Sequence, residues 1–116
     1  MSDDPHKAGL IPATIETYYL VLLHKGPTWH VLETPEELDL QNRHLAFLKS
    51  LYEAGKILAY GPTVGAPDNL RGINIVKASS AEEARTMLEQ DPRFLEGHFI
   101  YEVITWMADS RAWRER

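Results

Sequence analysis

The stretch TYYLVLLH, residues 17–24, is apolar at every position except its first and its last. Its aromatic, β-branched and aliphatic residues predict a β-strand, which should end at the breaker Lys25-Gly26-Pro27. Successive side chains of a strand point to opposite faces of a sheet, so this strand is apolar on both faces. We therefore expect a sheet that is covered on both sides.

A long amphipathic helix is predicted after the loop that follows this strand. Thr34 suits the N-cap, Pro35 suits the first helical position, and Glu37 can complete a capping box. The helix should run to Ala54 and stop at Gly55. Apolar side chains recur along it at helical spacing, as the stripe Leu45, Leu48, Leu51 and Tyr52.

The order of the remaining elements predicts the fold. They are a strand at 56–64 cut by Gly61-Pro62, a turn-rich connection at 65–72, a strand at 73–78, a helix at 80–90 and a strand at 98–106. Ser80 and Glu83 can form a second capping box, and the helix should end before Pro92. The resulting order, βαββαβ, predicts an α+β fold: a ferredoxin-like sandwich in which a four-stranded antiparallel sheet carries both helices on one face.

Two helices on one face would leave the other face of the sheet bare. The strands predicted at 17–24 and 98–106 are nevertheless apolar on both faces. A doubly wound sheet would cover both faces, but two helices are too few to build one. A second copy of the chain is the simplest cover, so we expect a homodimer that forms through the bare sheet face.

The length and composition are those of one globular domain. The chain has 116 residues, of which 44% are hydrophobic and 25% charged. Residues 1–16 contain Pro5, Gly9 and Pro12 among polar residues and show no structural period, which predicts a flexible N-terminal arm. The folded domain is expected at 17–107, with a C-terminal tail at 108–116.

Charge, hydropathy and cysteine content argue against several partners. A formal net charge of -5 argues against nucleic acid, because that affinity rests on clustered Lys and Arg. The longest apolar run, Tyr18 to Leu23, is far shorter than the ~20 residues of a membrane span, and no signal peptide is recognisable. Without cysteine there is neither a disulfide nor a thiolate site, so we expect a cytoplasmic protein. His24 and His30 flank one loop without a third ligand at a recognisable spacing, so no metal site is predicted.

An imidazole and a carboxylate are expected to meet across the two helices. The helices of this fold run antiparallel, and a rise of 1.5 Å per residue makes 44–54 about 15 Å long and 80–90 about 16 Å long. If Ala54 lies level with Ser80, then His44 lies level with Asp91. A carboxylate fixes the tautomer of a neighbouring imidazole and raises its basicity, as a general base requires. The alternative is structural, since histidines beside an apolar stripe usually pack and Asp-Pro often terminates a helix.

Several short motifs occur in a specific order along the chain. They are Arg43-His44-Leu45 with Leu48, Gly55-Lys56-Ile57-Leu58 leading to Gly61-Pro62, Ser80-x-Glu82-Glu83-Ala84, and Asp91-Pro92 followed by Gly97 and Val103. In this order and spacing the chain resembles the YCII-related (YciI-like) family of the dimeric α/β-barrel superfamily, over about residues 18–106. The resemblance makes 17–107 the YCII-related domain and implies a ferredoxin-like dimer with a pocket between helices and sheet.

The resemblance also implies which residues lie in the pocket. The family's helix histidine and the aspartate of its Asp-Pro motif correspond to His44 and Asp91. Gly61-Pro62 is interpreted as a strand kink that lines the pocket and contacts substrate. Two features depart from the family: Arg93 follows Asp-Pro where an aromatic residue is usual, and the loop at 26–34 is long. Either departure can change the substrate.

A cofactor-independent enzyme is the function that the resemblance favours. It would be an isomerase, or a lyase that eliminates a halide, and would act on a small cyclic or aromatic-derived acid with His44 as general acid/base and Asp91 as its orienting carboxylate. Two alternatives stay open: a non-catalytic small-molecule-binding or accessory protein, and a cofactor-free monooxygenase. The three tryptophans share no short period and are interpreted as packing or interface residues; they are Trp29, Trp106 and Trp113.

Overall fold

A computed structural model describes residues 13–66 and 69–113 of the chain. In chain order the elements are β1 (Ile15–Lys25), α1 (Pro35–Glu53), β2 (Ile57–Pro62), β3 (Leu70–Val76), α2 (Ala81–Leu88), α3 (Pro92–Leu95), β4 (Phe99–Asp109) and the 3₁₀ turn η1 (Ser110–Trp113). Residues 1–12 of the predicted arm and 114–116 of the predicted tail lie outside the described residues.

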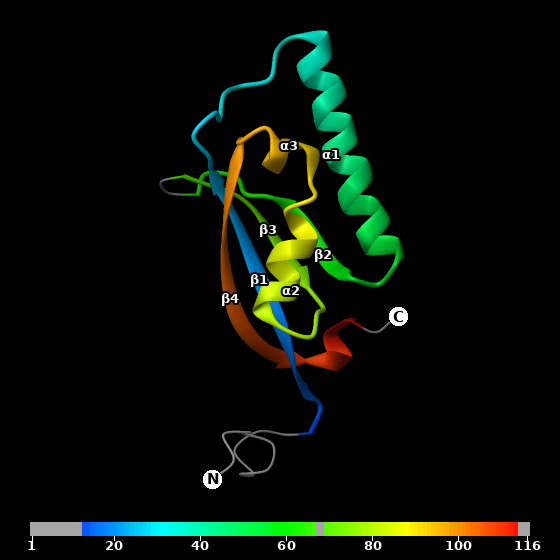
Figure 1. The fold of residues 1–116 in the computed structure, drawn as a ribbon. Coiled ribbons are helices and arrows are strands. Elements are labelled where there is room, and N and C mark those ends of the chain that lie inside the picture. Colours follow the sequence, from blue (N-terminus) through cyan, green and yellow to red (C-terminus); the bar gives the residue numbers. More distant parts are fainter. Residues whose placement is uncertain (1–12, 67–68, 114–116) are drawn as a thin grey trace.

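The four strands form one antiparallel sheet in the order β2-β3-β1-β4. The helices lie together on one side of this sheet, with α1 crossing its upper part and α2 its lower part in the view of Figure 1. The predicted ferredoxin-like α+β fold is therefore confirmed. The strands β1 and β4 pair over their full lengths, from Ile15 opposite Asp109 to Lys25 opposite Phe99. This pairing starts β1 inside the predicted arm and carries β4 into the predicted tail.

Local capping fixes the start and end of α1. The Thr34 hydroxyl accepts a hydrogen bond from the Glu37 backbone N–H, and the Glu37 carboxylate accepts one from the Thr34 backbone N–H. Ala54 is the C-cap, and Gly55 follows with a φ of 75°, a conformation that favours glycine. Both ends of the helix lie where the sequence predicts them.

The predicted apolar stripe of α1 is partly wrong. Leu45 and Tyr52 are 45% and 50% exposed, whereas the buried residues of the helix are Leu40, His44 and Leu48. These three recur every fourth position and form one row along the helix. The row faces the sheet because α1 docks on it, so His44 is at the centre of the buried face and not at its border.

The segment that follows α2 contains a helix that sequence reasoning missed. Ser80 caps α2 as predicted, although the Glu83 carboxylate bonds Ser79 and does not close the box on Ser80. Asp91-Pro92 ends the α2 region but also starts α3, with Asp91 as its N-cap. A proline cannot continue a helix, yet its fixed φ suits the first position of the next one.

The core lies between the helices and the inner face of the sheet. Its buried members come from both layers: Tyr19, Val21, Leu23, Leu48, Ile57, Val76, Ala84, Leu88, Phe99 and Tyr101. Alternate residues of β1 and β4 therefore point into the core. Leu88 and Ala84 of α2 are fully buried against this face, and the Tyr101 hydroxyl donates to the Leu88 carbonyl.

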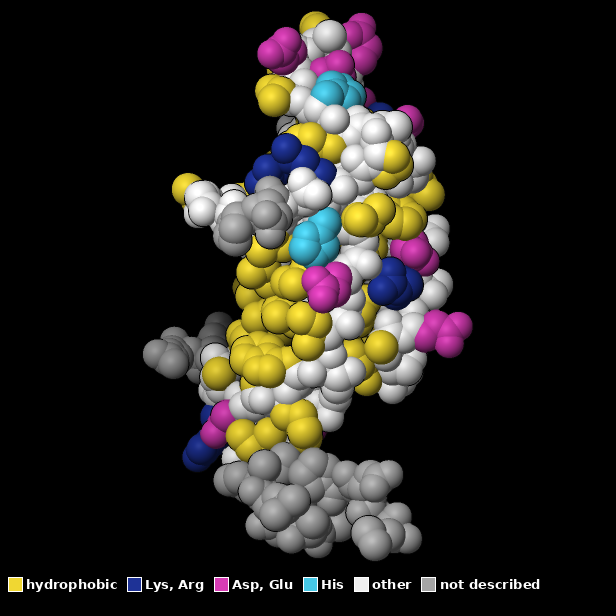
Figure 2. Space-filling view, turned by 90° about the vertical axis from the view of Figure 1, so that its left-hand side faces the viewer, with side chains coloured by type: hydrophobic (Ala, Val, Ile, Leu, Met, Phe, Trp, Pro, Cys, Tyr) yellow, Lys and Arg dark blue, Asp and Glu magenta, His cyan; other side chains and the backbone are white. Residues whose placement is uncertain are grey.

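The outer face of the sheet is apolar, and no α-helix of residues 13–66 and 69–113 lies over it. Figure 2 shows hydrophobic side chains gathered over the middle of this face. Ile100, Ile104 and Trp106 of β4 are 53%, 40% and 41% exposed there. Within the described residues, no helix is long and apolar enough to cross a membrane.

Candidate active site

The predicted imidazole–carboxylate pair is present and buried. His44 Nδ1 lies 2.5 Å from Asp91 Oδ2, and the two residues are 6% and 1% exposed. His44 comes from the middle of α1, and Asp91 comes from the turn between α2 and α3. The antiparallel docking of the helical segments thus brings together two residues that are 47 positions apart.

The turn that holds Asp91 also orients its carboxylate. As the N-cap of α3, Asp91 accepts the Arg93 backbone N–H through Oδ1 at 2.9 Å. A cap of this kind satisfies an otherwise unpaired helix N–H and holds the side chain in place. The other oxygen, Oδ2, is left for His44. The same Asp-Pro sequence that ends one helix therefore positions the carboxylate.

A pocket of about 360 Å³ opens beside His44, between α1 and the inner face of the sheet. Gly61 and Pro62, which were predicted to contact substrate, line its wall at the end of β2. The apolar part of the lining comes from several elements and includes Leu23, Trp29, Leu48, Tyr60 and Phe99. Asp91 does not line the pocket and sits behind the imidazole. The arrangement exposes His44 to a ligand and shields its carboxylate partner.

Arg93 also lines the pocket, although the sequence did not predict a role for it there. Its Nε donates to His98 Nδ1 at 3.1 Å, and its Nη1 donates to Gln41 Oε1 at 2.7 Å. The guanidinium carbon lies 5.1 Å from the centre of the Trp29 ring and 4.6 Å from that of Phe99. Burial lowers the pKa of Arg93, and the nearby Asp91 carboxylate partly offsets this. An arginine pKa starts so high that the side chain remains a cation.

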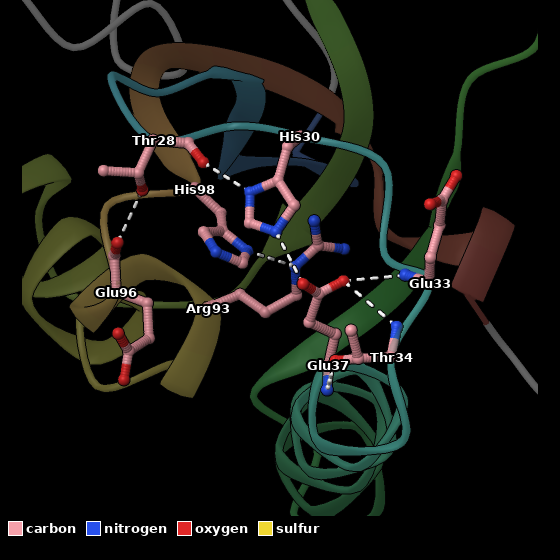
Figure 3. Close-up of polar contacts among 8 residues, drawn as sticks. All are labelled: Thr28, His30, Glu33, Thr34, Glu37, Arg93, Glu96 and His98. Carbon is pink, nitrogen blue, oxygen red and sulfur yellow. Dashed lines mark hydrogen bonds and ion pairs between the residues drawn. The ribbon is translucent and has the colours of Figure 1, made fainter.

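The long loop at 26–34 closes one side of the pocket. Gly26 N–H donates to the His98 carbonyl, and Thr28 Oγ1 donates to the Glu96 carbonyl at 2.6 Å. Figure 3 shows His30 reaching from the Thr28 carbonyl to the Glu37 carboxylate, beside the Arg93 guanidinium. These bonds tie the loop to α1 and to the start of β4. Trp29 is thereby held against the pocket, so it is more than the packing residue that we expected.

The pKa values of two histidines beside the pocket are shifted in opposite directions. Burial lowers the pKa of His98, and the positive charge of Arg93 lowers it further. The pKa of His30 is raised by its hydrogen bond to the Thr28 carbonyl and then by Glu37. Neutral His98 can therefore accept from Arg93 through Nδ1, as its contact requires.

The other predicted residues lie away from the pocket. His24 contacts Glu102 at 2.9 Å on the outer sheet face, Trp106 lies on that face, and Trp113 packs edge-on against Tyr18. Across residues 13–66 and 69–113, no group of three His, Cys, Asp or Glu side chains is arranged to hold a metal ion.

Comparisons with known proteins agree with this fold and with the family resemblance. The chain is 29% identical to the 5-chloro-2-hydroxyhydroquinone dehydrochlorinase TftG from Burkholderia phenoliruptrix AC1100, solved in complex with 2,5-dihydroxybenzoquinone. That match has a TM-score of 0.57 and covers 77% of this chain and 92% of TftG. No curated protein matches the sequence significantly. A sequence model of the YCII-related domain matches residues 17–107, and the chain therefore belongs to the YCII-related family.

Proposed function

We propose that the protein is a cofactor-independent enzyme that moves a proton on a small cyclic or aromatic-derived acid. The reaction is an isomerisation or the elimination of a halide. The observation that carries the proposal is the buried contact of His44 with Asp91 at the wall of an apolar pocket. Similarity to a dehydrochlorinase favours the elimination.

In this proposal Asp91 sets the tautomer of His44. An ionised carboxylate only accepts hydrogen bonds, so Nδ1 of His44 carries the proton that lies between the two residues. The lone pair of the neutral ring is then on Nε2, which has no hydrogen bond to any described residue. Because His44 lines the pocket, Nε2 is the atom that accepts a substrate proton. Asp91 stabilises the imidazolium that forms.

Both reactions balance without an electron acceptor. In the elimination, Nε2 removes a proton from the substrate, the released electron pair forms a double bond, and the halide leaves with the electrons of its carbon–halogen bond. In the isomerisation, the same proton returns to a different carbon. One acid/base group is enough for either reaction, which fits a pocket whose lining contains a single histidine.

The size and lining of the pocket support a small, flat substrate. Small-molecule sites are commonly about 300–1,000 Å³ and mostly apolar, so a pocket of about 360 Å³ suits one ring better than a large cofactor. Leu23, Leu48 and Phe99 present apolar surface near His44. A ring held there would exclude water from the imidazole, which strengthens its electrostatic interactions.

We also propose that the protein is a homodimer through the outer sheet face and works in the cytoplasm. The side chains of Ile104 and Trp106 are 40% and 41% exposed on successive positions of that face, and Ile100, 53% exposed, lies on the same face beyond Glu102. A contiguous apolar patch of this kind marks an interaction site, and a second copy presents the same patch. The lack of cysteine agrees with a reducing compartment.

The test is turnover on a panel of chlorinated and unchlorinated hydroxyquinols and hydroxybenzoates. Chloride release, ultraviolet absorbance, and deuterium exchange followed by proton NMR report elimination and isomerisation. The wild type should turn over at least one compound, and His44→Gln should lose this activity. His24→Gln is a matched control, because His24 also contacts a carboxylate but lies outside the pocket.

The outcomes separate the candidate functions. Unchanged turnover in His44→Gln would refute the acid/base role. Binding of the panel without turnover by the wild type would indicate a non-catalytic binder. Oxygen consumption with the same compounds would indicate a monooxygenase.

A further inference from the structure

Two buried side chains in the pocket have donor groups that the acid/base pair does not use. We infer that Arg93 and Asn74 form a carboxylate-binding subsite, so that the ligand is a small planar organic acid held by its carboxylate. The inference rests on the proposed function in taking the same pocket as the ligand site. It adds the group that the ligand must carry and the residues that recognise it.

Most of the donors of Arg93 have no partner. A guanidinium has five N–H donors, and Arg93 places one on His98 and one on Gln41. Its Nη2 atom is buried and lacks a hydrogen-bond partner among the described residues. Both partners that it does have are neutral acceptors at pH 7, since the pKa of His98 is lowered. An acceptor that carries negative charge would fit the remaining donors.

Asn74 supplies a second unpaired donor to the same pocket. It lies on β3, is 2% exposed, and its Nδ2 atom is buried without a partner in the described part of the chain. A buried amide donor without a partner has lost its hydrogen bonds to water and lowers the stability of the fold. A buried polar residue at an otherwise apolar strand position therefore indicates a function in binding. A ligand oxygen in the pocket would satisfy it.

The positive charge of the pocket also favours an anionic ligand. The chain has a formal net charge of -5, but the described residues that line the pocket include Arg71 and Arg93 and no aspartate or glutamate. Both cations lie close to Trp29, with the guanidinium carbons of Arg71 and Arg93 5.7 Å and 5.1 Å from its ring centre. Positive charge in a low-dielectric pocket raises the local concentration of anions.

The buried charge of Arg93 lacks a dedicated carboxylate. A fully buried arginine is usually paired with an acidic group. Asp91 is the carboxylate whose charge raises the pKa of Arg93, but its oxygens already accept from His44 and from the Arg93 backbone. No described carboxylate lies within ion-pair distance of the guanidinium. A ligand carboxylate would supply the missing counter-charge, with Trp29 and Phe99 forming flat walls beside it.

The experiment compares benzoate with benzamide, which has nearly the same shape but no charge. Calorimetric titration of the wild type should show binding of benzoate and binding of benzamide that is about tenfold weaker or more. Arg93→Gln should remove this preference. Arg43→Gln should keep it, because Arg43 lies on α1 and pairs with Asp39 outside the pocket.

Two further variants keep the result independent of folding and of turnover. Asn74→Asp has nearly unchanged shape and adds a negative charge, so it should weaken the binding of benzoate much more than that of benzamide. His44→Gln should still prefer benzoate even if it is inactive, which separates this inference from the proposed acid/base function. Equal binding of the two probes by the wild type, or no binding of benzoate, would overturn the inference, whatever the variants do.

Discussion

His44 on α1 and Asp91 at the N-cap of α3 make a buried 2.5 Å contact, and the backbone N–H of Arg93 holds the second oxygen of the same carboxylate. Asp91 therefore links the helix cap to the imidazole. The cap fixes the carboxylate, the carboxylate fixes the ring, and the ring faces the pocket.

Asp91→Asn should lower turnover by about 10²–10⁴-fold with little loss of stability. The asparagine oxygen can still cap α3, but the amide cannot stabilise an imidazolium as a carboxylate does. Adding His44→Gln should cause little further loss, because the two residues act as a unit. Steady-state kinetics measure the loss, and nitrogen NMR should show that the single Nδ1–H tautomer of His44 is lost. Full turnover in Asp91→Asn would contradict the proposed role.

Stability should depend on pH through His98. Its folded-state pKa lies below the ordinary 6.5, so the unfolded chain binds a proton first as the pH falls. The contribution of His98 to the free energy of unfolding should therefore be complete above pH 6.5. It should decrease as the pH falls toward the folded-state pKa and then level off. His98→Gln retains an acceptor for Arg93 Nε and should flatten this decrease. Urea unfolding on both sides of pH 6.5 measures it.

His30 should affect stability at a different pH from His98, and it therefore serves as a control. Its pKa is raised, so its contribution is present below pH 6.5 and is lost as the pH rises through the folded-state value. His30→Gln should therefore remove a rise in stability that occurs as the pH falls toward 6.5, and should leave the decrease below pH 6.5 unchanged. If both variants changed the decrease in the same direction, the assignment of the two histidines would be wrong.

Gly26→Ala should destabilise the protein by about 1–3 kcal/mol, because the new methyl group has no space. Its carbon would lie 2.3 Å from the Gly97 carbonyl oxygen and 2.8 Å from the Phe99 backbone nitrogen. Both contacts are with backbone, which cannot rotate away. Gly61→Ala is the matched control: an added carbon there meets nothing within 4 Å, so stability should change by less than about 0.5 kcal/mol. Equal urea midpoints for the two variants would refute the close approach.

Ile104→Lys should convert the proposed dimer into a monomer. Ile104 is 40% exposed on the outer sheet face, where a lysine ammonium would have to be buried in the interface. Leu38→Lys on α1, where the leucine is 51% exposed, is the control and should leave the dimer intact. Equilibrium sedimentation at micromolar concentration measures the mass. A wild-type monomer would refute the interface, and a dimeric Ile104→Lys variant would place it elsewhere.

The contacts between near neighbours in the sequence that begin and end α1 were predicted correctly. Thr34 caps α1 through Glu37, three residues away, and Gly55 ends the helix through its own backbone conformation. Two helix lengths and an antiparallel arrangement also brought His44 level with Asp91 but left a structural interpretation open, and the family resemblance then favoured the pair. Leu45 and Tyr52 were misplaced because helical spacing does not say which row of side chains faces the sheet.

The residues that shape the pocket could not be found in the same way. Arg93 stood out only as a departure from the family pattern after Asp-Pro. Its partner Gln41 is 52 positions away, and the ring of Trp29 comes from a loop without a structural period. Asn74 gave no signal at all on a strand that otherwise reads as core. Contacts of this kind depend on how separate elements meet in space.

The order of the four strands, α1 and α2 and the N-caps at Thr34 and Ser80 follow from local periodicity and backbone preference, so they could be predicted from the amino-acid sequence. Three features could be seen only in the folded chain: α1 turns its 40–44–48 row to the sheet, the loop at 26–34 holds Trp29 against the pocket, and Arg93 and Asn74 keep donors there without a partner among the described residues. These features arise from packing between distant segments, in which burial and charge are set by neighbours that the local sequence does not contain.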